Sequence, residues 1–364
     1  ENVTGVDNTL TIDTLKSSET MRQIAATATA PYTLVYMKEQ YMEMGLYALE
    51  RMLRIAECTG AGMVYADHYN ISAEGVRSEA PVIDYQQGSL RDDFDFGSVL
   101  LFRTDALKKA AANMTQSYQA AGFYDLRLKL SISERFEHIN EFLYSEVELD
   151  NRKTGEKLFD YVDPRNRASQ IEMEAAATEH LKAIGAYLKP TFKSVDLKAE
   201  PFDVEASIMI PVRNRIRTIR DAIESALSQK TNFKFNVFIV ENGPDYHSTD
   251  GTTELIDEYK NDERVIHIIP NRRDIGVGNS WNMAAHHPQC GRFIVQLDSD
   301  DVYSDEHTLQ KFVDAFYEQQ CAMVIGSYML TDIHKNMLPP GKIDHREWTP
   351  ENGRNNALRI NGLG

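Results

Sequence analysis

The sequence predicts an α/β protein with tandem doubly wound, mostly parallel sheets. Two observations support this prediction. From residue 206 onward, short apolar runs typical of strands alternate with amphipathic segments of about ten residues or more, which is the pattern of βαβ units. Part of the same pattern also recurs near the N-terminus at a constant spacing.

The C-terminal half gives the clearest succession of elements. The expected strands are 206–212, 235–243, 265–270, 292–297 and 322–330, and the expected helices between them are 218–229, 252–260, 278–287 and 308–320. The strand segments are rich in Val, Ile and Phe, whereas the helical segments have apolar residues at helical spacing. Ligands of such sheets bind at the carboxyl ends of the strands, so residues just after each strand are candidates for a site.

The N-terminal third resembles the C-terminal part without gaps. Three residue pairs are each 260 positions apart, namely Val35 and Val295, Met63 and Met323, and Asp84 and Asp344. We interpret the two stretches as a duplicated fold. On this register the first copy lacks a counterpart of the opening βαβ unit, and the second lacks a counterpart of the residues after 104. We expect a chain cut from a longer protein, and a permuted arrangement, with 104–190 completing the second copy, is the alternative.

The expected boundary lies near 190 to 203. Residues 170–188 have the spacing of an amphipathic helix, and the following stretch, KPTFKSVDLKAEPF, has a proline near each end, as linkers often do. We therefore expect a degenerate domain over 1–190 that ends in a helix, a linker over 191–204, and a second domain over 205–364 that is truncated at its C-terminal end.

Composition excludes several classes of protein. The chain has 364 residues, enough for two domains, and its 55 acidic against 39 basic residues give a net charge of -16, which disfavours nucleic acid as a partner. Three cysteines without CxxC spacing argue against a disulfide framework. No apolar run approaches the ~18 residues of a membrane span. We expect a cytoplasmic protein, with peripheral contact at the inner face of the membrane left open.

Polar segments follow the expected strands at 211–215, 241–243, 271–282 and 298–301. Each segment alone fits ordinary turn chemistry, but together they are expected to converge on one cleft. Asp298 and Asp300 sit two positions apart, and an extended backbone would aim both carboxylates the same way, as in a site for a divalent cation. An acidic turn before the next helix is the alternative. At the matching position the first copy has Lys38 in place of Asp298, so the fold itself does not require these acids.

These segments give residues 206 to about 330 a specific resemblance. IMIPVRNR, VFIVENG with the later STDGT, IGVGNSWNMA and FIVQLDSDD resemble the nucleotide-sugar-binding half of a bacterial family-2 glycosyltransferase of GT-A fold. The resemblance implies transfer of a sugar, with inversion, from a UDP- or GDP-linked donor to a hydroxyl of a saccharide or lipid-linked acceptor. Polysaccharide or glycoconjugate synthesis is the implied setting.

The resemblance also assigns roles to residues. The implied donor-binding residues are Pro211, Val212, Arg213, Asn214, Glu241, Asn242, Arg273, Gly276, Asp298 and Ser299. Asp298, Asp300 and Asp301 are implied to hold Mn²⁺ or Mg²⁺ against the donor diphosphate. The sequence departs from the family where Asn242 replaces an acid and PDYH is inserted before STDGT, which leaves the base specificity undetermined.

A general base is harder to place. In this family it belongs to an acidic motif well beyond the metal-binding acids, and Asp125 in the first copy marks a position whose counterpart would fall past residue 364. Asp344 and Glu347 are the stand-in candidates, and contacts to the acceptor are their alternative use.

Two other functions stay open. A sugar-nucleotide nucleotidyltransferase would need a glycine-rich, lysine-containing loop after the first strand, and PVRNRIRT lacks one. A non-catalytic scaffold that binds carbohydrate or nucleotide is the other alternative. In the first copy a charged lysine cannot ligate a metal, so Lys38 predicts that metal binding is lost there.

Overall fold

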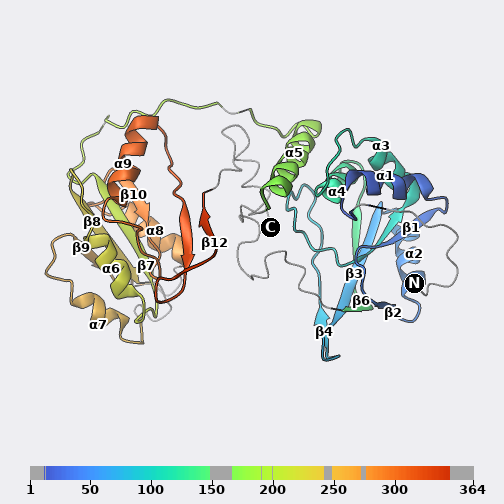
Figure 1. The fold of residues 1–364 in the computed structure, drawn as a ribbon, viewed down its shortest axis with the longest axis horizontal. Coiled ribbons are helices and arrows are strands. Elements are labelled where there is room, and N and C mark those ends of the chain that lie inside the picture. Colours follow the sequence, from blue (N-terminus) through green and yellow to red (C-terminus); the bar gives the residue numbers. More distant parts are fainter. Residues whose placement is uncertain are drawn as a thin grey trace. The chain divides into compact units, whose positions relative to one another are not determined.

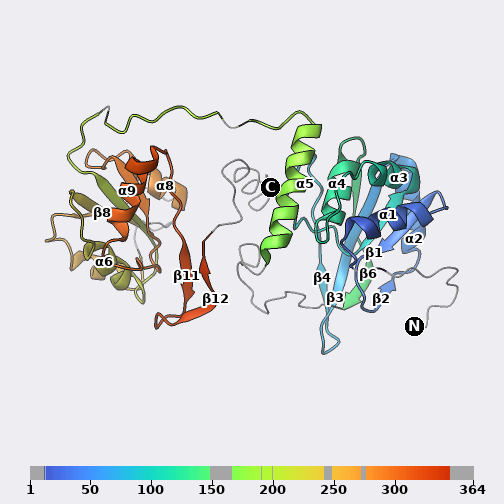
Figure 2. The same ribbon diagram turned by 45° about the horizontal axis from the view of Figure 1, so that its top comes forward.

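A computed structural model describes residues 12, 14–147, 166–189, 191–198, 200–241, 248–271 and 276–344 (Figures 1 and 2). The chain divides into two compact units. The first unit comprises 1–190 with 327–364, and the second comprises 191–326, so residues 327–364 group differently from the predicted domain over 205–364. Within the described residues, no helix is long and apolar enough to cross a membrane. All three cysteines are free.

A parallel sheet forms the centre of the second unit. Its strands are β7 (Ala206–Val212), β8 (Phe235–Glu241), β9 (Val265–Ile268) and β10 (Phe293–Gln296). Their order is β10-β7-β8-β9, and every neighbouring pair is parallel. All 7 residues of β7 and all 7 of β8 are buried, because helices cover both faces of the sheet.

Alternate residues of β7 face the two helical layers. The helices are α6 (Ile219–Leu227), α7 (Thr252–Asp257), α8 (Val277–Ala285) and α9 (Thr308–Gln319) (Figure 1). Ile208 and Ile210 belong to the core that contains residues of α6, α7 and α9. Met209 belongs to a separate core with Ala284 of α8. The second unit is therefore doubly wound, as the sequence predicts.

The sheet of the first unit is mixed. Its strands are β1 (Tyr32–Tyr36), β2 (Met42–Met44), β3 (Met63–Ile71), β4 (Arg77–Ala80), β5 (Val99–Arg103) and β6 (Phe136–Val147). The order is β1-β5-β3-β6-β2, with β4 attached to β3, and β3–β6 is the parallel pair among antiparallel ones. The expectation of a mostly parallel sheet is thus corrected for this unit. A tight turn from β3 into β4 forces an antiparallel pair, and apolar periodicity does not reveal strand direction.

Helices cover both faces of this mixed sheet as well. They are α1 (Ser18–Thr27), α2 (Ala48–Thr59), α3 (Thr104–Ala112), α4 (Gly122–Ser131) and α5 (Arg167–Ala183). Residues of α1, α3 and α4 share one core with the sheet, and residues of α2 share another. The helix α5 packs on α4 through a third cluster, which confirms the helix expected before the linker.

Elements 260 residues apart have matching conformations. The helix α2 begins at 48 and ends at 59, and α9 begins at 308 and ends at 319. The strands β11 (Tyr328–Thr331) and β12 (Met337–Ile343) form a hairpin. It pairs Thr331 with Met337, and the β3–β4 hairpin pairs Ile71 with Arg77 at the equivalent position.

The two hairpin turns also share their internal hydrogen bonds. The Ser72 N–H donates to the Val76 carbonyl at 2.9 Å, and the Asp332 N–H donates to the Asn336 carbonyl at 3.0 Å. Gly75 and Lys335, which are also 260 residues apart, both have positive φ. These matches support the predicted duplication, which stays a proposal.

We predict that Gly122→Ala destabilises the first unit. A Cβ atom on Gly122 would lie 2.1 Å from the backbone nitrogen of Ser18, where α4 meets the start of α1. Overpacking of this kind costs about 1–3 kcal/mol or more. Urea denaturation followed by hydrogen exchange of peptides from α1 and α4 measures the loss.

Gly278→Ala is the matched control. A Cβ atom on Gly278, which lies in α8, would have no heavy atom within 4 Å. Helix propensity then favours alanine by about 1 kcal/mol. Equal stability of the Gly122→Ala variant and the wild type would contradict the packing described at α4.

Candidate functional site

At the carboxyl edge of the parallel sheet, β7 and β10 separate from each other. The strand β10 pairs with β7 from Ala206 to Met209, and the Leu297 N–H then donates to the Met209 carbonyl at 3.0 Å. The pairing of β7 with β8 continues to Val212 and Glu241. Chain order runs from β7 to β9 on one side and returns to β10 on the other, so the switch point lies between β7 and β10. Ligands of doubly wound sheets bind at such a point.

Pro211 fits this divergence. Backbone groups of successive strand residues point alternately to the two neighbouring strands, so Pro211 faces the same side as Met209, toward β10. Proline has no N–H to donate, and β10 has already ended at Gln296 opposite Met209. A proline at this place costs no ladder hydrogen bond and lets the following loop leave the sheet.

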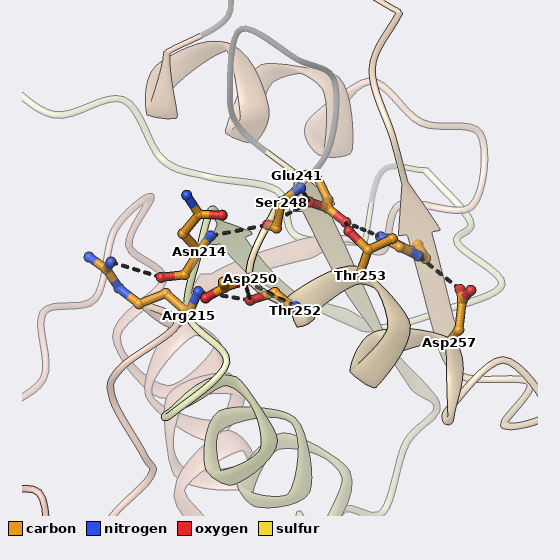
Figure 3. A network of polar contacts seen from close by, with 9 residues as sticks. Asn214, Arg215, Glu241, Ser248, Asp250, Thr252, Thr253 and Asp257 are labelled. Atoms are coloured by element: carbon orange, nitrogen blue, oxygen red, sulfur yellow. Dashed lines mark hydrogen bonds and ion pairs between the residues drawn. The ribbon is translucent and has the colours of Figure 1, made fainter.

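The loop after β7 is held by the segment 248–252 (Figure 3). The Asn214 N–H donates to Ser248 Oγ at 3.0 Å, and the Asn214 side-chain oxygen accepts from the Thr249 N–H at 2.8 Å. The Arg215 N–H donates to Thr252 Oγ1 at 2.9 Å. Asn214 has φ of 53°, a left-handed conformation that asparagine tolerates better than most residues. The backbone of this loop is therefore fixed, while the side chain of Arg215 is exposed.

Glu241 is the buried anchor of segment 248–253 (Figure 3). Its side chain is fully buried, one carboxylate oxygen accepts from the N–H and hydroxyl of Ser248, and the other accepts from Thr253 Oγ1 at 2.7 Å. His267 Nε2 lies 3.3 Å from that second oxygen. Burial would raise the pKa of Glu241, but the hydrogen bonds from His267, Thr253 and Ser248 together lower it. Both carboxylate oxygens have partners within the protein, so Glu241 anchors this segment, and its contact with the donor stays a prediction.

The acidic segment after β10 forms a tight turn. The Asp301 N–H donates to the Asp298 carbonyl at 3.1 Å, so the backbone reverses here instead of staying extended. The expectation of two parallel carboxylates on an extended strand end is therefore wrong. Asp298, Asp300 and Asp301 are nonetheless all exposed on the same turn, whereas Ser299 is buried.

The charges of this turn interact with one another and with the loop after β7. Partial desolvation, followed by repulsion from Asp298 and Asp300, raises the pKa of Asp301. Arg215 Nε lies 3.7 Å from Asp300 Oδ2, which is a contact between the two loops at the switch point. Arg213 is exposed as well. The guanidinium group of Arg215 and the clustered carboxylates thus lie in the same region, an arrangement suited to a cation together with an anionic ligand.

The described residues contain no preformed metal centre. In the described ranges, no three His, Cys, Asp or Glu side chains converge in a way that could hold a metal ion. The carboxylates still fit a cation in one respect, because the repulsion that raises the pKa of Asp301 is relieved when positive charge binds. Ligand atoms from a diphosphate would have to complete the coordination.

The structure brings together part of the predicted site. Arg213, Asn214 and Asp298 lie exposed at the switch point, and Pro211 and Val212 are buried within β7. Other predicted residues lie on other elements or outside the described residues. Gly276 is the N-cap of α8, Asp344 follows β12, and Asn242, Arg273 and Glu347 lie outside the described ranges.

Arg215 was missed by the sequence reasoning. Its place in the predicted polar segment 211–215, two positions after Arg213, was the available signal.

Comparison with known proteins points to the same segment. Residues 207–362 match the family model described as Glycosyl transferase family 2. An uncharacterized glycosyltransferase of Rickettsia felis is 35% identical over 154 residues, which cover 40% of this chain and 24% of that protein. The putative teichuronic acid biosynthesis glycosyltransferase TuaG of Bacillus subtilis is 29% identical over 124 residues, which cover 34% of this chain and 46% of that protein.

A solved structure is also similar. The crystal structure of S. aureus TarS has 22% sequence identity and a TM-score of 0.27, over 35% of this chain and 21% of that chain. The chain spans between about a quarter and a half of the length of the two curated relatives above. The segment that carries the switch point matches glycosyl transferase family 2, and its sheet is parallel, as the sequence predicts.

We predict that Glu241→Gln loosens segment 248–253 and destabilises the second unit. The NH2 group of the glutamine would face Ser248 or Thr253, which are themselves donors to Glu241. Loss of a hydrogen bond to a charged group lowers the free energy of unfolding by about 1.5–3 kcal/mol. Hydrogen exchange of peptides from 248–253 and from β8 during urea denaturation measures this at pH 7. Glu254→Gln, the same change on an exposed residue nearby, is the control and should leave the exchange unchanged.

The sign of the pH dependence follows from the lowered pKa of Glu241. Its stabilisation is present above the unfolded-state pKa of about 4.3 and is lost as pH falls through the lower folded-state pKa. The difference between the wild type and Glu241→Gln should therefore shrink below about pH 4. A difference that stays constant down to pH 2 would contradict the ionised, hydrogen-bonded state of Glu241.

Proposed function

We propose that the second unit binds the nucleotide-diphospho-sugar donor of a glycosyltransferase. The protein would transfer the sugar, with inversion, from a UDP- or GDP-linked donor to an acceptor hydroxyl in polysaccharide or glycoconjugate synthesis. One observation carries the proposal, namely the arginine-bearing loop after β7 and the acidic turn after β10, which meet at the switch point through Arg215 and Asp300. Both lie within the segment that matches glycosyl transferase family 2. The name of TuaG, which refers to teichuronic acid biosynthesis, supports the proposed polysaccharide setting.

Charge explains why both loops are needed. The chain carries a net charge of -16, so a diphosphate approaches against the field of the whole molecule and needs positive charge at the site. Arg213 and Arg215 supply guanidinium groups, whose planar fork of donors matches phosphate oxygens. The fixed backbone around Asn214 places both side chains before a ligand arrives, so less side-chain and loop freedom is lost on binding.

We place a divalent cation, Mn²⁺ or Mg²⁺, at Asp298, Asp300 and Asp301. Hard cations of this kind take carboxylate and phosphate oxygens together. The mutual repulsion at Asp301 and the exposure of the three carboxylates fit this role. A bound cation would stabilise negative charge on the leaving diphosphate. Arg215 would lie between Asp300 and the phosphate, so it would orient the donor as well as neutralise it.

The remaining parts of the proposal concern the rest of the chain. We propose that the first unit is a degenerate second copy, which is supported by the matching helices α2 and α9 and the matching hairpin turns. Asp344 and Glu347 stay predictions for the base. At the position equivalent to Asp344, Asp84 Oδ1 lies 2.8 Å from His138 Nδ1. A saccharide or lipid-linked acceptor and a cytoplasmic location complete the proposal.

The direct test is titration of UDP and GDP with and without Mn²⁺, followed by calorimetry. We expect binding of one of the two nucleotides to require the metal and to be lost in Asp300→Ala and Asp298→Ala. Asp314→Ala, which removes an exposed carboxylate from α9, is the control and should bind as the wild type does. Absence of nucleotide binding in any metal would overturn the proposed function.

A second prediction concerns Arg215. Arg215→Ala should weaken binding of the nucleoside diphosphate by about 10- to 100-fold, since a hydrogen bond to a charged group contributes about 1.5–3 kcal/mol. Arg217→Ala, also exposed and two positions further along the loop, serves as the control. The same titration compares the variants at two salt concentrations. Equal losses in both variants would point to general charge attraction and would remove the specific role of Arg215.

A further inference from the structure

A second polar cluster lies at the carboxyl edge of the first sheet. The strands β1 and β3 are both antiparallel to β5, and β3 is parallel to β6, so the ends of β1, β3 and β6 share one edge. Lys38 follows β1, while His68 and Glu146 lie on β3 and β6. Figure 1 shows β3 and β6 side by side, as their pairing requires.

Lys38, Ser98 and His68 all contact the same carboxylate oxygen of Glu146. Lys38 Nζ lies 2.5 Å from Glu146 Oε1, the Ser98 hydroxyl donates to it at 3.1 Å, and His68 Nε2 lies 3.4 Å from it. The side chain of Glu146 is 1% exposed and that of His68 is 6% exposed. The ammonium group of Lys38 thus neutralises the charge of Glu146. None of these contacts involves the other carboxylate oxygen, Oε2.

Three buried polar atoms of this region lack a partner. Among the described residues, Glu146 Oε2, His68 Nδ1 and the Tyr36 hydroxyl have no hydrogen-bond partner. A buried polar group without a hydrogen bond destabilises the fold by about 1–3 kcal/mol. Three such groups close together are therefore unusual in a cluster that has only a structural role. Burial, followed by the charge of Glu146, raises the pKa of Tyr36 to about 12, so the phenol keeps its proton and can donate.

The charges exclude the ligands proposed for the second unit. Lys38 stands 260 residues before Asp298, so an ammonium group occupies the position of a carboxylate at the acidic turn. A divalent cation would have to displace this ammonium from Glu146. A diphosphate would have to compete with the carboxylate of Glu146 for the ammonium group of Lys38. A neutral ligand rich in hydroxyl groups meets neither obstacle, because hydroxyls donate to carboxylates and both donate to and accept from imidazole and phenol.

Exposed aromatic residues adjoin the same edge. Tyr41 is 68% exposed, and its carbonyl accepts from the Val147 N–H at 3.4 Å, directly after Glu146. Tyr47 is also 68% exposed and adopts φ of 60°, which a bulky residue rarely does without a reason. A tyrosine ring offers an apolar face and a polar hydroxyl, which suits the apolar face and the hydroxyl rim of a sugar ring.

We propose that the first unit binds a neutral saccharide at this edge without a metal. Its hydroxyls would bond Glu146 Oε2, His68 Nδ1 and the Tyr36 hydroxyl, with Tyr41 lying against the ring. The Lys38 side chain, which is 25% exposed, forms the outer cover of the cluster and would move to admit the ligand. The inference deepens the proposed function, since the saccharide would be the acceptor chain.

Saturation-transfer NMR on the full chain tests this, with glucose, galactose, N-acetylglucosamine and their β-linked disaccharides as probes. EDTA removes divalent cations, so this experiment does not depend on the metal-dependent nucleotide site. A failure of nucleotide binding would therefore be a separate result. We expect transfer to at least one probe, reduced by more than half in Tyr41→Ala and in Glu146→Gln. Asp300→Ala should leave the transfer unchanged.

Tyr41→Ala keeps the test decisive if Glu146→Gln fails to fold, because Tyr41 is exposed. Phe192→Ala, which removes another exposed aromatic ring, is the matched control and should bind as the wild type does. Absence of transfer from every probe would overturn the inference. Transfer that is retained in both Tyr41→Ala and Glu146→Gln would overturn it as well.

Discussion

The second unit is organised by the place where β10 stops pairing with β7. Beyond Met209 and Leu297 these strands separate, while β7 continues beside β8 to Glu241. Proline at 211 suits that separation because it has no N–H to pair. The loop that follows carries exposed arginines, and the turn after β10 carries exposed carboxylates. The charged side chains therefore lie where the two strands separate. The buried carboxylate of Glu241 holds Ser248, and Ser248 in turn holds the backbone of the loop after β7 at Asn214.

The two units place different chemistry at similar sheet edges. In the second unit, partial desolvation and then repulsion from Asp298 and Asp300 raise the pKa of Asp301, and Arg215 Nε lies 3.7 Å from Asp300 Oδ2. In the first unit the ammonium of Lys38 lies 2.5 Å from a buried carboxylate. An added cation would therefore stabilise the carboxylates of the second unit, whereas the carboxylate of the first unit already has a cation beside it. A division of labour between a charged donor and a neutral acceptor would follow from this difference.

The sequence predicted β7 to β10, the helices between and after them, and the helix α5, because periodicity and turn residues are local signals. The strand expected over 322–330 was wrong, since only Tyr328–Thr331 forms a strand, and it pairs with β12 instead of joining the parallel sheet. It did not predict the mixed sheet of the first unit, since strand direction depends on pairing between distant segments such as β3 and β6. An acid at a strand end looks the same whether it is exposed or buried, so the supporting role of Glu241 was invisible. At Asp298 the sequence left an extended strand end and an acidic turn open, because one backbone hydrogen bond decides between them.

The central claim is that a nucleoside diphosphate and a divalent cation bind together at the switch point between β7 and β10. Anomalous scattering from Mn²⁺ in crystals grown with UDP or GDP locates the ion most directly. The account predicts an ion in direct contact with carboxylates of the acidic turn and with the diphosphate, and a phosphate within hydrogen-bonding reach of Arg215. An ion bound elsewhere, or a nucleotide bound at the amino edge of the sheet, would contradict it.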